Sequence, residues 1–137
     1  MTNRARGPFE VKLTPQGEAD KAEGSVLARM SIDKQFHGEL EGASKGEMLS
    51  AGTDVKGSAG YVAMERVSGI LNGRTGSFVL QHTGTMARGT PHLSITVVPD
   101  SGSGELAGIS GKMSIEIAPG GKHSYDFEYT LEASAAA

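Results

Sequence analysis

The stretch Tyr61–Met86, which reads YVAMERVSGILNGRTGSFVLQHTGTM, decides the fold class of this chain. Apolar and polar residues alternate on both sides of Asn72-Gly73, and alternation with a period of two is typical of a half-buried β-strand. Asn-Gly between two such runs is a strong hairpin signal, because both residues accept the positive φ angles of a type I′ turn. The stretch therefore predicts two antiparallel strands joined by a tight turn.

Similar alternating segments follow one another along the chain and predict about eight strands. They cover residues 8–13, 25–35, 38–53, 60–71, 75–86, 92–98, 109–118 and 123–131. Residues 16–23, rich in Glu, Ala, Asp and Lys, are the only place where we expect a helical turn. Without crossover helices the strands must be mainly antiparallel, so we predict an all-β fold: a single eight-stranded antiparallel closed barrel, with a sandwich as the alternative.

The length of 137 residues fits one domain, which we assign to residues 1–137. We expect residues of about 8–131 to be folded and the tail 132–137, which has no alternation, to be disordered. No apolar run approaches the ~20 residues of a membrane span, and the N-terminal residues lack the apolar core of a secretory signal. The sequence therefore predicts a cytoplasmic protein without a membrane partner.

The charges and the missing cysteines exclude several classes of function. Thirteen basic and 16 acidic residues are scattered along the chain, and no basic block could neutralise several phosphates, so we expect no nucleic-acid partner. The chain has no cysteine, and its four histidines lack close ligand spacing, so we predict no metal. Gly42–Gly46 matches the G-x-S-x-G pattern by chance, because no helix follows it. No phosphate-binding loop precedes a helix, and we expect no cofactor.

Both faces of the hairpin carry apolar residues, whereas a half-buried strand usually exposes one polar face to solvent. One face carries Val62, Met64, Ile70 and Val79, and the other carries Tyr61, Val67, Phe78 and Leu80. A barrel buries one face in its interior, and a second subunit is the simplest cover for the other. We therefore predict a homo-oligomer.

Three stretches resemble the signature of an uncharacterised bacterial family, a domain of unknown function. They are residues 60–84, 92–108 (HLSITVVPDSGSGELAG) and 123–129 (HSYDFEY). The barrel of that family is similar to plant allene oxide cyclase and, more distantly, to dirigent proteins. The resemblance extends from about Phe9 to Leu131 and implies an eight-stranded barrel with a cavity able to hold an apolar small molecule. No catalytic residue of the plant enzyme matches a position here, so none is transferred.

Glu65 and His82 are the candidate catalytic residues, and the hairpin register decides whether they meet. A two-residue loop at Asn72-Gly73 sets Glu65 against Leu80 and makes it a diagonal neighbour of His82, whereas a four-residue loop sets the two opposite each other. A three-residue loop separates them onto opposite faces. Inside an apolar barrel, desolvation is expected to raise the carboxyl pKa and let the pair share a proton for general acid/base catalysis. The alternative is a structural buried pair, or two solvated side chains on an outward face.

The candidate ligand-binding residues share the predicted interior face of the hairpin and of the last strand. They are Tyr61, Val67, Phe78, Leu80, Tyr125, Phe127 and Tyr129. We expect a barrel that binds a small apolar or amphipathic molecule in its lumen. Two alternatives stay open: a cofactor-free cyclase or isomerase using Glu65 with His82, and a packed barrel that acts as an interaction protein through its outer surface.

Overall fold

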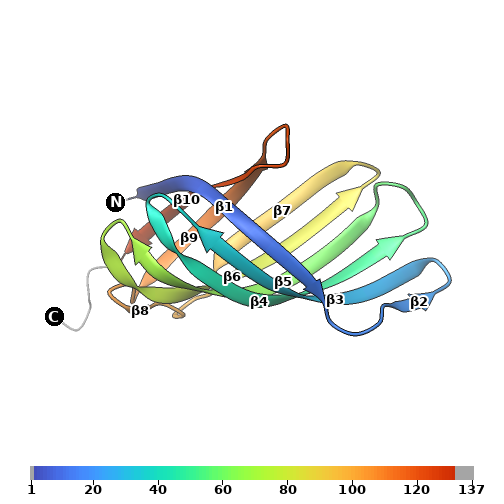
Figure 1. Ribbon diagram of the computed structural model, residues 1–137, viewed down its shortest axis with the longest axis horizontal. Helices are drawn as coiled ribbons and strands as arrows, with labels where there is room; N and C mark the ends of the chain where they lie inside the picture. Colours follow the sequence, from blue (N-terminus) through green and yellow to red (C-terminus); the bar gives the residue numbers. More distant parts are fainter. Residues whose placement is uncertain (1, 132–137) are drawn as a thin grey trace.

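The computed structural model describes residues 2–131, and every regular element in this part of the chain is a β-strand (Figure 1). The strands are β1 (Asn3–Pro15), β2 (Asp20–Ala22), β3 (Ser25–Phe36), β4 (Leu40–Thr53), β5 (Ala59–Leu71), β6 (Arg74–Ala87), β7 (Thr90–Val97), β8 (Ser103–Gly104), β9 (Ile109–Ile117) and β10 (His123–Leu131).

Eight of these strands close into a ring. The order is β1-β10-β9-β7-β6-β5-β4-β3, and pairing of β1 with β3 closes it. All pairs are antiparallel, and the short strands β2 and β8 lie outside the ring, beside β3 and β6. The predicted all-β, eight-stranded antiparallel closed barrel is confirmed.

The central hairpin has the two-residue loop. Leu71 pairs with Arg74 across the turn, and Asn72 and Gly73 have φ angles of 47° and 86°, as a type I′ turn requires. The same register sets Glu65 against Leu80 and Ala63 against His82. The odd-numbered residues of β5 from 61 to 67 therefore share a face with the even-numbered residues of β6, and the alternating burial of both strands places this face in the interior.

Two local expectations at the N-terminal end are wrong. Residues 16–23 contain no helical turn; within them Asp20–Ala22 form the strand β2, which pairs with the part of β3 that β1 does not reach. The first strand begins at Asn3 rather than near residue 8, and residues 3–9 pair with β10. Its inward residues there, Ala5 and Gly7, are too small to produce a visible hydrophobic alternation. The tail 132–137 lies outside the described residues.

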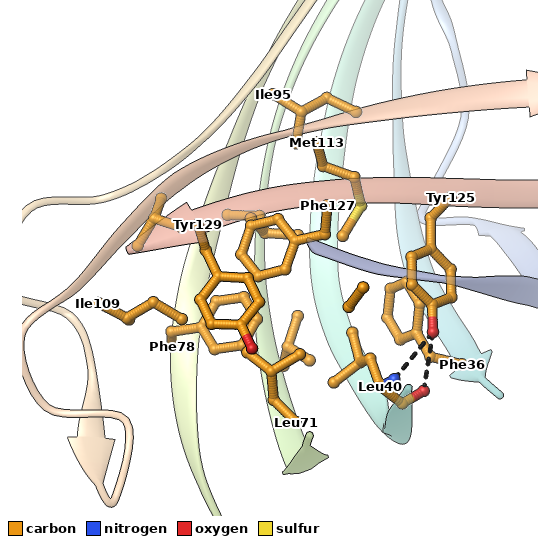
Figure 2. Packing of buried hydrophobic residues seen from close by; sticks show 14 of the residues in the cluster. Phe36, Leu40, Leu71, Phe78, Ile95, Ile109, Met113, Tyr125, Phe127 and Tyr129 are labelled. Atoms are coloured by element: carbon orange, nitrogen blue, oxygen red, sulfur yellow. Dashed lines mark hydrogen bonds between the residues drawn. The ribbon is translucent and has the colours of Figure 1, made fainter. Parts of the chain in front are cut away.

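One end of the barrel is filled by a hydrophobic core (Figure 2). The rings of Phe78 and Phe127 stack with centroids 5.4 Å apart, and Phe127 stacks on Tyr129 at 5.2 Å. The Tyr125 hydroxyl donates to the His37 carbonyl at 2.7 Å and accepts from the Leu40 amide at 3.0 Å. These contacts seal the end that contains the β3–β4 and β5–β6 turns.

The opposite end is open, and its inward-facing residues are apolar. Along β6, exposure rises from 1 % at Phe78 to 43 % at Met86, although both side chains point inward. β7 and β9 pair only at Ile95–Met113 and Thr96–Lys112, and beyond these pairs the two strands diverge toward the open end (Figure 1). We call the exposed inward-facing residues of this end the mouth: Leu13, Val26, Met86, Leu93 and Ile117.

Candidate functional site

Five polar side chains meet inside the barrel, between the packed end and the mouth. We call them the polar cluster: Lys34 on β3, Ser44 on β4, Tyr61 and Glu65 on β5, and His82 on β6. The strands β3 to β6 are consecutive neighbours in the sheet, and all five residues fall on the inward phase of their alternation. The barrel therefore collects them from four adjacent strands.

Glu65 lies at the centre of the cluster and is almost completely buried. Its Oε1 accepts hydrogen bonds from Lys34 Nζ at 2.9 Å and from His82 Nε2 at 2.6 Å. Its Oε2 accepts from Ser44 Oγ at 2.5 Å. Both carboxylate oxygens thus have partners, as a charge at this depth requires.

The pKa of Glu65 results from opposing influences. Burial, the largest single one, raises the pKa of the carboxyl group. The hydrogen bond from His82, the positive charges of Lys34 and His82 and the hydrogen bond from Ser44 together outweigh burial, and they lower the pKa from 4.5 to about 2. The expectation of a raised carboxyl pKa is therefore wrong, because it did not include Lys34 and Ser44. Glu65 is ionised at neutral pH and is a weak base.

The ionised carboxylate fixes the direction of a hydrogen-bond chain. A carboxylate only accepts, so the proton between His82 and Glu65 belongs to His82 Nε2. In neutral His82 the other ring nitrogen, Nδ1, then accepts from the Tyr61 hydroxyl, which lies 3.2 Å away. Burial and, to a smaller extent, the charge of Glu65 raise the pKa of Tyr61, so its hydroxyl keeps its proton. When His82 is neutral, the hydrogen-bond chain therefore runs from Tyr61 through His82 to Glu65.

Tyr61 is the member of the cluster nearest the mouth, and a glycine makes room for it. Gly84 pairs with Tyr61 across β5 and β6, and a Cβ atom added there would stand 2.5 Å from Tyr61 Cε1 and 3.3 Å from a methyl of Leu93. Tyr61 is half-buried, whereas Glu65 and His82 are buried. Its hydroxyl group is therefore the point at which the cluster approaches the open end.

The structure brings the two predicted catalytic residues together as diagonal neighbours, in the register predicted for a two-residue loop. It distributes the predicted ligand-binding residues differently. Tyr61 borders the mouth, and the other six pack in the closed end: Val67, Phe78, Leu80, Tyr125, Phe127 and Tyr129. The Tyr129 hydroxyl accepts from Asn72 Nδ2 at 2.7 Å. The catalytic and ligand-binding roles stay predictions.

Lys34 and Ser44 are the site residues that sequence reasoning missed. Lys34 stands between Ile32 and Phe36 on the inward phase of its strand, so a charged residue within an apolar face was the available signal. Ser44 belongs to the G-x-S-x-G match, and its hydroxyl donates to Glu65 within the barrel wall rather than lying on a strand-to-helix turn.

Among residues 2–131, no group of three or more His, Cys, Asp or Glu side chains could hold a metal ion. Within that range, no helix has the length and apolar character needed to cross a membrane.

Fold and site together define a closed antiparallel barrel with an ionised polar cluster inside it and one open, apolar end. A family model described as "Protein of unknown function (DUF3224)" matches residues 5–129, and the chain belongs to this family. A search of curated proteins found no match. The predicted membership of an uncharacterised bacterial family is confirmed, whereas the likeness to allene oxide cyclase stays a prediction.

A solved structure shares both the sequence and the fold. It is the crystal structure of a protein with unknown function from the DUF3224 family of Shewanella oneidensis MR-1. It is 52% identical to this chain, covers 98% of it and is itself covered completely, with a TM-score of 0.92. The similarity therefore applies to the whole barrel.

Proposed function

We propose that this protein binds a small amphipathic molecule in the open end of its lumen. The observation that carries the proposal is the mouth, where inward-facing apolar side chains such as Met86 and Leu93 are more than two-fifths exposed to solvent. Burying this apolar surface under a ligand gains about 25 cal/mol per Å². The apolar part of the ligand lies against the mouth residues.

The polar group of the ligand meets Tyr61. When His82 is neutral, the Tyr61 hydroxyl donates a hydrogen bond to His82 Nδ1. The lone pairs of the hydroxyl oxygen remain able to accept a hydrogen bond from the ligand. A ligand with a donor such as a hydroxyl group is therefore favoured over a bare hydrocarbon. The closed end, packed by Phe78 and Phe127, forms the floor beneath the polar cluster.

The test uses two commercial probes, 1-decanol and decane, with amide-resolved NMR titration of the whole chain. We expect decanol to shift resonances of β6, β7 and β9 at the mouth and to bind about tenfold more tightly than decane. L93D is expected to abolish the shifts, whereas I70D, an equally exposed apolar position on the outer surface, leaves them unchanged. Shifts that survive L93D, or that are centred elsewhere, contradict the proposal.

A second candidate function, cofactor-free proton transfer of cyclase or isomerase type, is favoured by the chain from Tyr61 through His82 to Glu65. In this function the Tyr61 oxygen takes a proton from the substrate while the Tyr61 proton moves to His82 Nδ1, and the low pKa of Glu65 suits it to orienting His82. Y61F separates the two functions. A binder keeps its apolar contacts with affinity reduced about tenfold, whereas an enzyme that uses this hydroxyl loses turnover by about 100-fold or more. The cytoplasmic location and the absence of a cofactor stay predictions.

A further inference from the structure

Four large apolar side chains lie together on the outer surface of β3, β4 and β5. Leu27, Leu49, Val62 and Met64 are each about half exposed, and we call them the outer patch. Leu49 pairs with Val62 across the two strands, and Met64 is the next outward residue along β5. The outer patch is separate from the mouth, whose side chains point inward. Contiguous exposed apolar surface marks contact sites.

Charges of both signs border the outer patch. Arg29 pairs with Leu49 in the sheet, and Glu47 pairs with Met64. Arg29 Nε and Glu47 Oε1 are 3.4 Å apart, and both side chains are more than half exposed. A two-fold symmetric interface needs a surface that is complementary to itself. A two-fold axis that lies in the plane of the contact and passes through Leu49 can set Arg29 of one copy against Glu47 of the other, in two equivalent pairs.

Two hollows lie on the outer surface at the outer patch. One hollow of about 610 Å³ includes Leu27, Leu49 and Val62, and a second of about 450 Å³ includes Leu49, Val62 and Met64. Leu49 and Val62, together with Arg29, line both hollows, so the two hollows adjoin each other. The half-exposed Leu49 and Val62 side chains of one copy can enter a hollow of the other, and the reverse contact follows by symmetry.

We propose that the outer patch is the surface through which two copies of this chain form a two-fold symmetric dimer. Leu49 and Val62 lie at its centre, where desolvated apolar contacts contribute most to binding. The sequence predicted a subunit contact on the face that carries Val62, Met64, Ile70 and Val79, and the proposal keeps only Val62 and Met64 of these. Ile70 lies near the opposite end of β5, and Val79 is half-buried beside Ser101, so both are outside the contact.

The first experiment is sedimentation velocity of the whole chain over a concentration series. We expect the wild type to reach twice the chain mass of 14.2 kDa and V62E to remain at the single-chain mass. I70E is the matched control, because Ile70 is on the same outward face of the same strand and equally exposed. It is expected to keep the dimer. Thermal unfolding of each variant, followed by circular dichroism, shows whether it is folded.

The second experiment exchanges charges and does not depend on an apolar substitution. The R29E chain carries two acidic side chains at the border and the E47R chain carries two basic ones, so each is expected to dimerise about tenfold more weakly than wild type. Mixing the two variants pairs opposite charges at both contacts and is expected to restore a mixed dimer at the wild-type concentration. Native mass spectrometry distinguishes mixed from like pairs.

Three results overturn the proposal. A wild-type chain that stays monomeric at all concentrations excludes the dimer. A dimer that V62E leaves intact, or that I70E also disrupts, excludes the outer patch as its surface. A mixture of R29E and E47R that forms no more mixed dimer than either variant forms alone excludes the two-fold arrangement of Arg29 and Glu47.

Discussion

Replacing Glu65 by Gln removes the buried negative charge that accepts hydrogen bonds from the other side chains of the polar cluster. In the native protein the carboxyl pKa is about 2, compared with 4.5 for the free group. At about 1.4 kcal/mol per pKa unit, this difference corresponds to about 3 kcal/mol of native-state stability. In E65Q, Lys34 also loses its counter-charge inside the barrel, so we expect a total loss of about 3–5 kcal/mol at pH 7.

The pH dependence of this loss has a definite sign. Because the folded-state pKa is lowered, the stabilisation by Glu65 is complete above the unfolded-state pKa of 4.5 and disappears as pH falls toward 2. We therefore expect the difference in free energy of unfolding between wild type and E65Q to be constant above about pH 6 and to shrink by about 3 kcal/mol toward pH 2.

Urea unfolding at fixed protein concentration, from pH 7 to pH 2.5, measures this difference. E10Q is the matched control, because Glu10 is largely exposed, and its effect is expected to stay within about 0.5 kcal/mol at every pH. If wild type and E65Q lose stability in parallel as pH falls, Glu65 is not ionised in the folded protein, and the reasoning fails.

Three other substitutions test the packing around the site by urea unfolding or NMR. Y125F removes a buried hydroxyl with backbone partners and is expected to cost about 1–2 kcal/mol. N72A removes a side-chain hydrogen bond at a residue with φ of 47° and is expected to cost about 1–2 kcal/mol. G84A pushes the Tyr61 ring away and is expected to change the ¹⁵N shift of His82 Nδ1, with a loss of about 1–3 kcal/mol.

Controls for these substitutions come from the same turn and from β4. N72D keeps a residue that tolerates positive φ and loses only the amide, so a full loss there assigns the effect to the hydrogen bond. G52A adds a methyl group with no atom within 4 Å and is expected to be neutral. A neutral G84A contradicts the assigned contact with Tyr61.

The fold was predictable because the decisive signals are local. Asn72-Gly73 favours a two-residue turn, and a turn of known length fixes which residues of the two strands share a face. Glu65 and His82 share a face for a two- or a four-residue loop but not for a three-residue loop, and the register of the structure decides between them. Residues 3–7 gave no such signal, because the inward positions there are Ala5 and Gly7.

The electrostatics of the site was not predictable in the same way. Lys34 and Ser44 reach Glu65 from β3 and β4, and these contacts depend on the pairing of strands that turn chemistry does not specify. Desolvation alone suggested a raised carboxyl pKa, whereas the partners from neighbouring strands reverse its direction. The divergence of β7 and β9, which opens the mouth, likewise depends on the closed ring. The alternation of apolar and polar residues along these strands does not indicate it.

Closure of the ring joins the first and last strands described, since Asn3 pairs with Tyr129. During synthesis β1 leaves the ribosome long before β10, and until then only β3 can pair with it. The seam between β1 and β10 therefore cannot form until β10 has been synthesised, and pairing over so long a sequence separation slows folding. A nascent chain that stalls before residue 123 exposes an unpaired edge of β1. Such an edge can pair with the strands of other chains and start aggregation, so a cell must shield it.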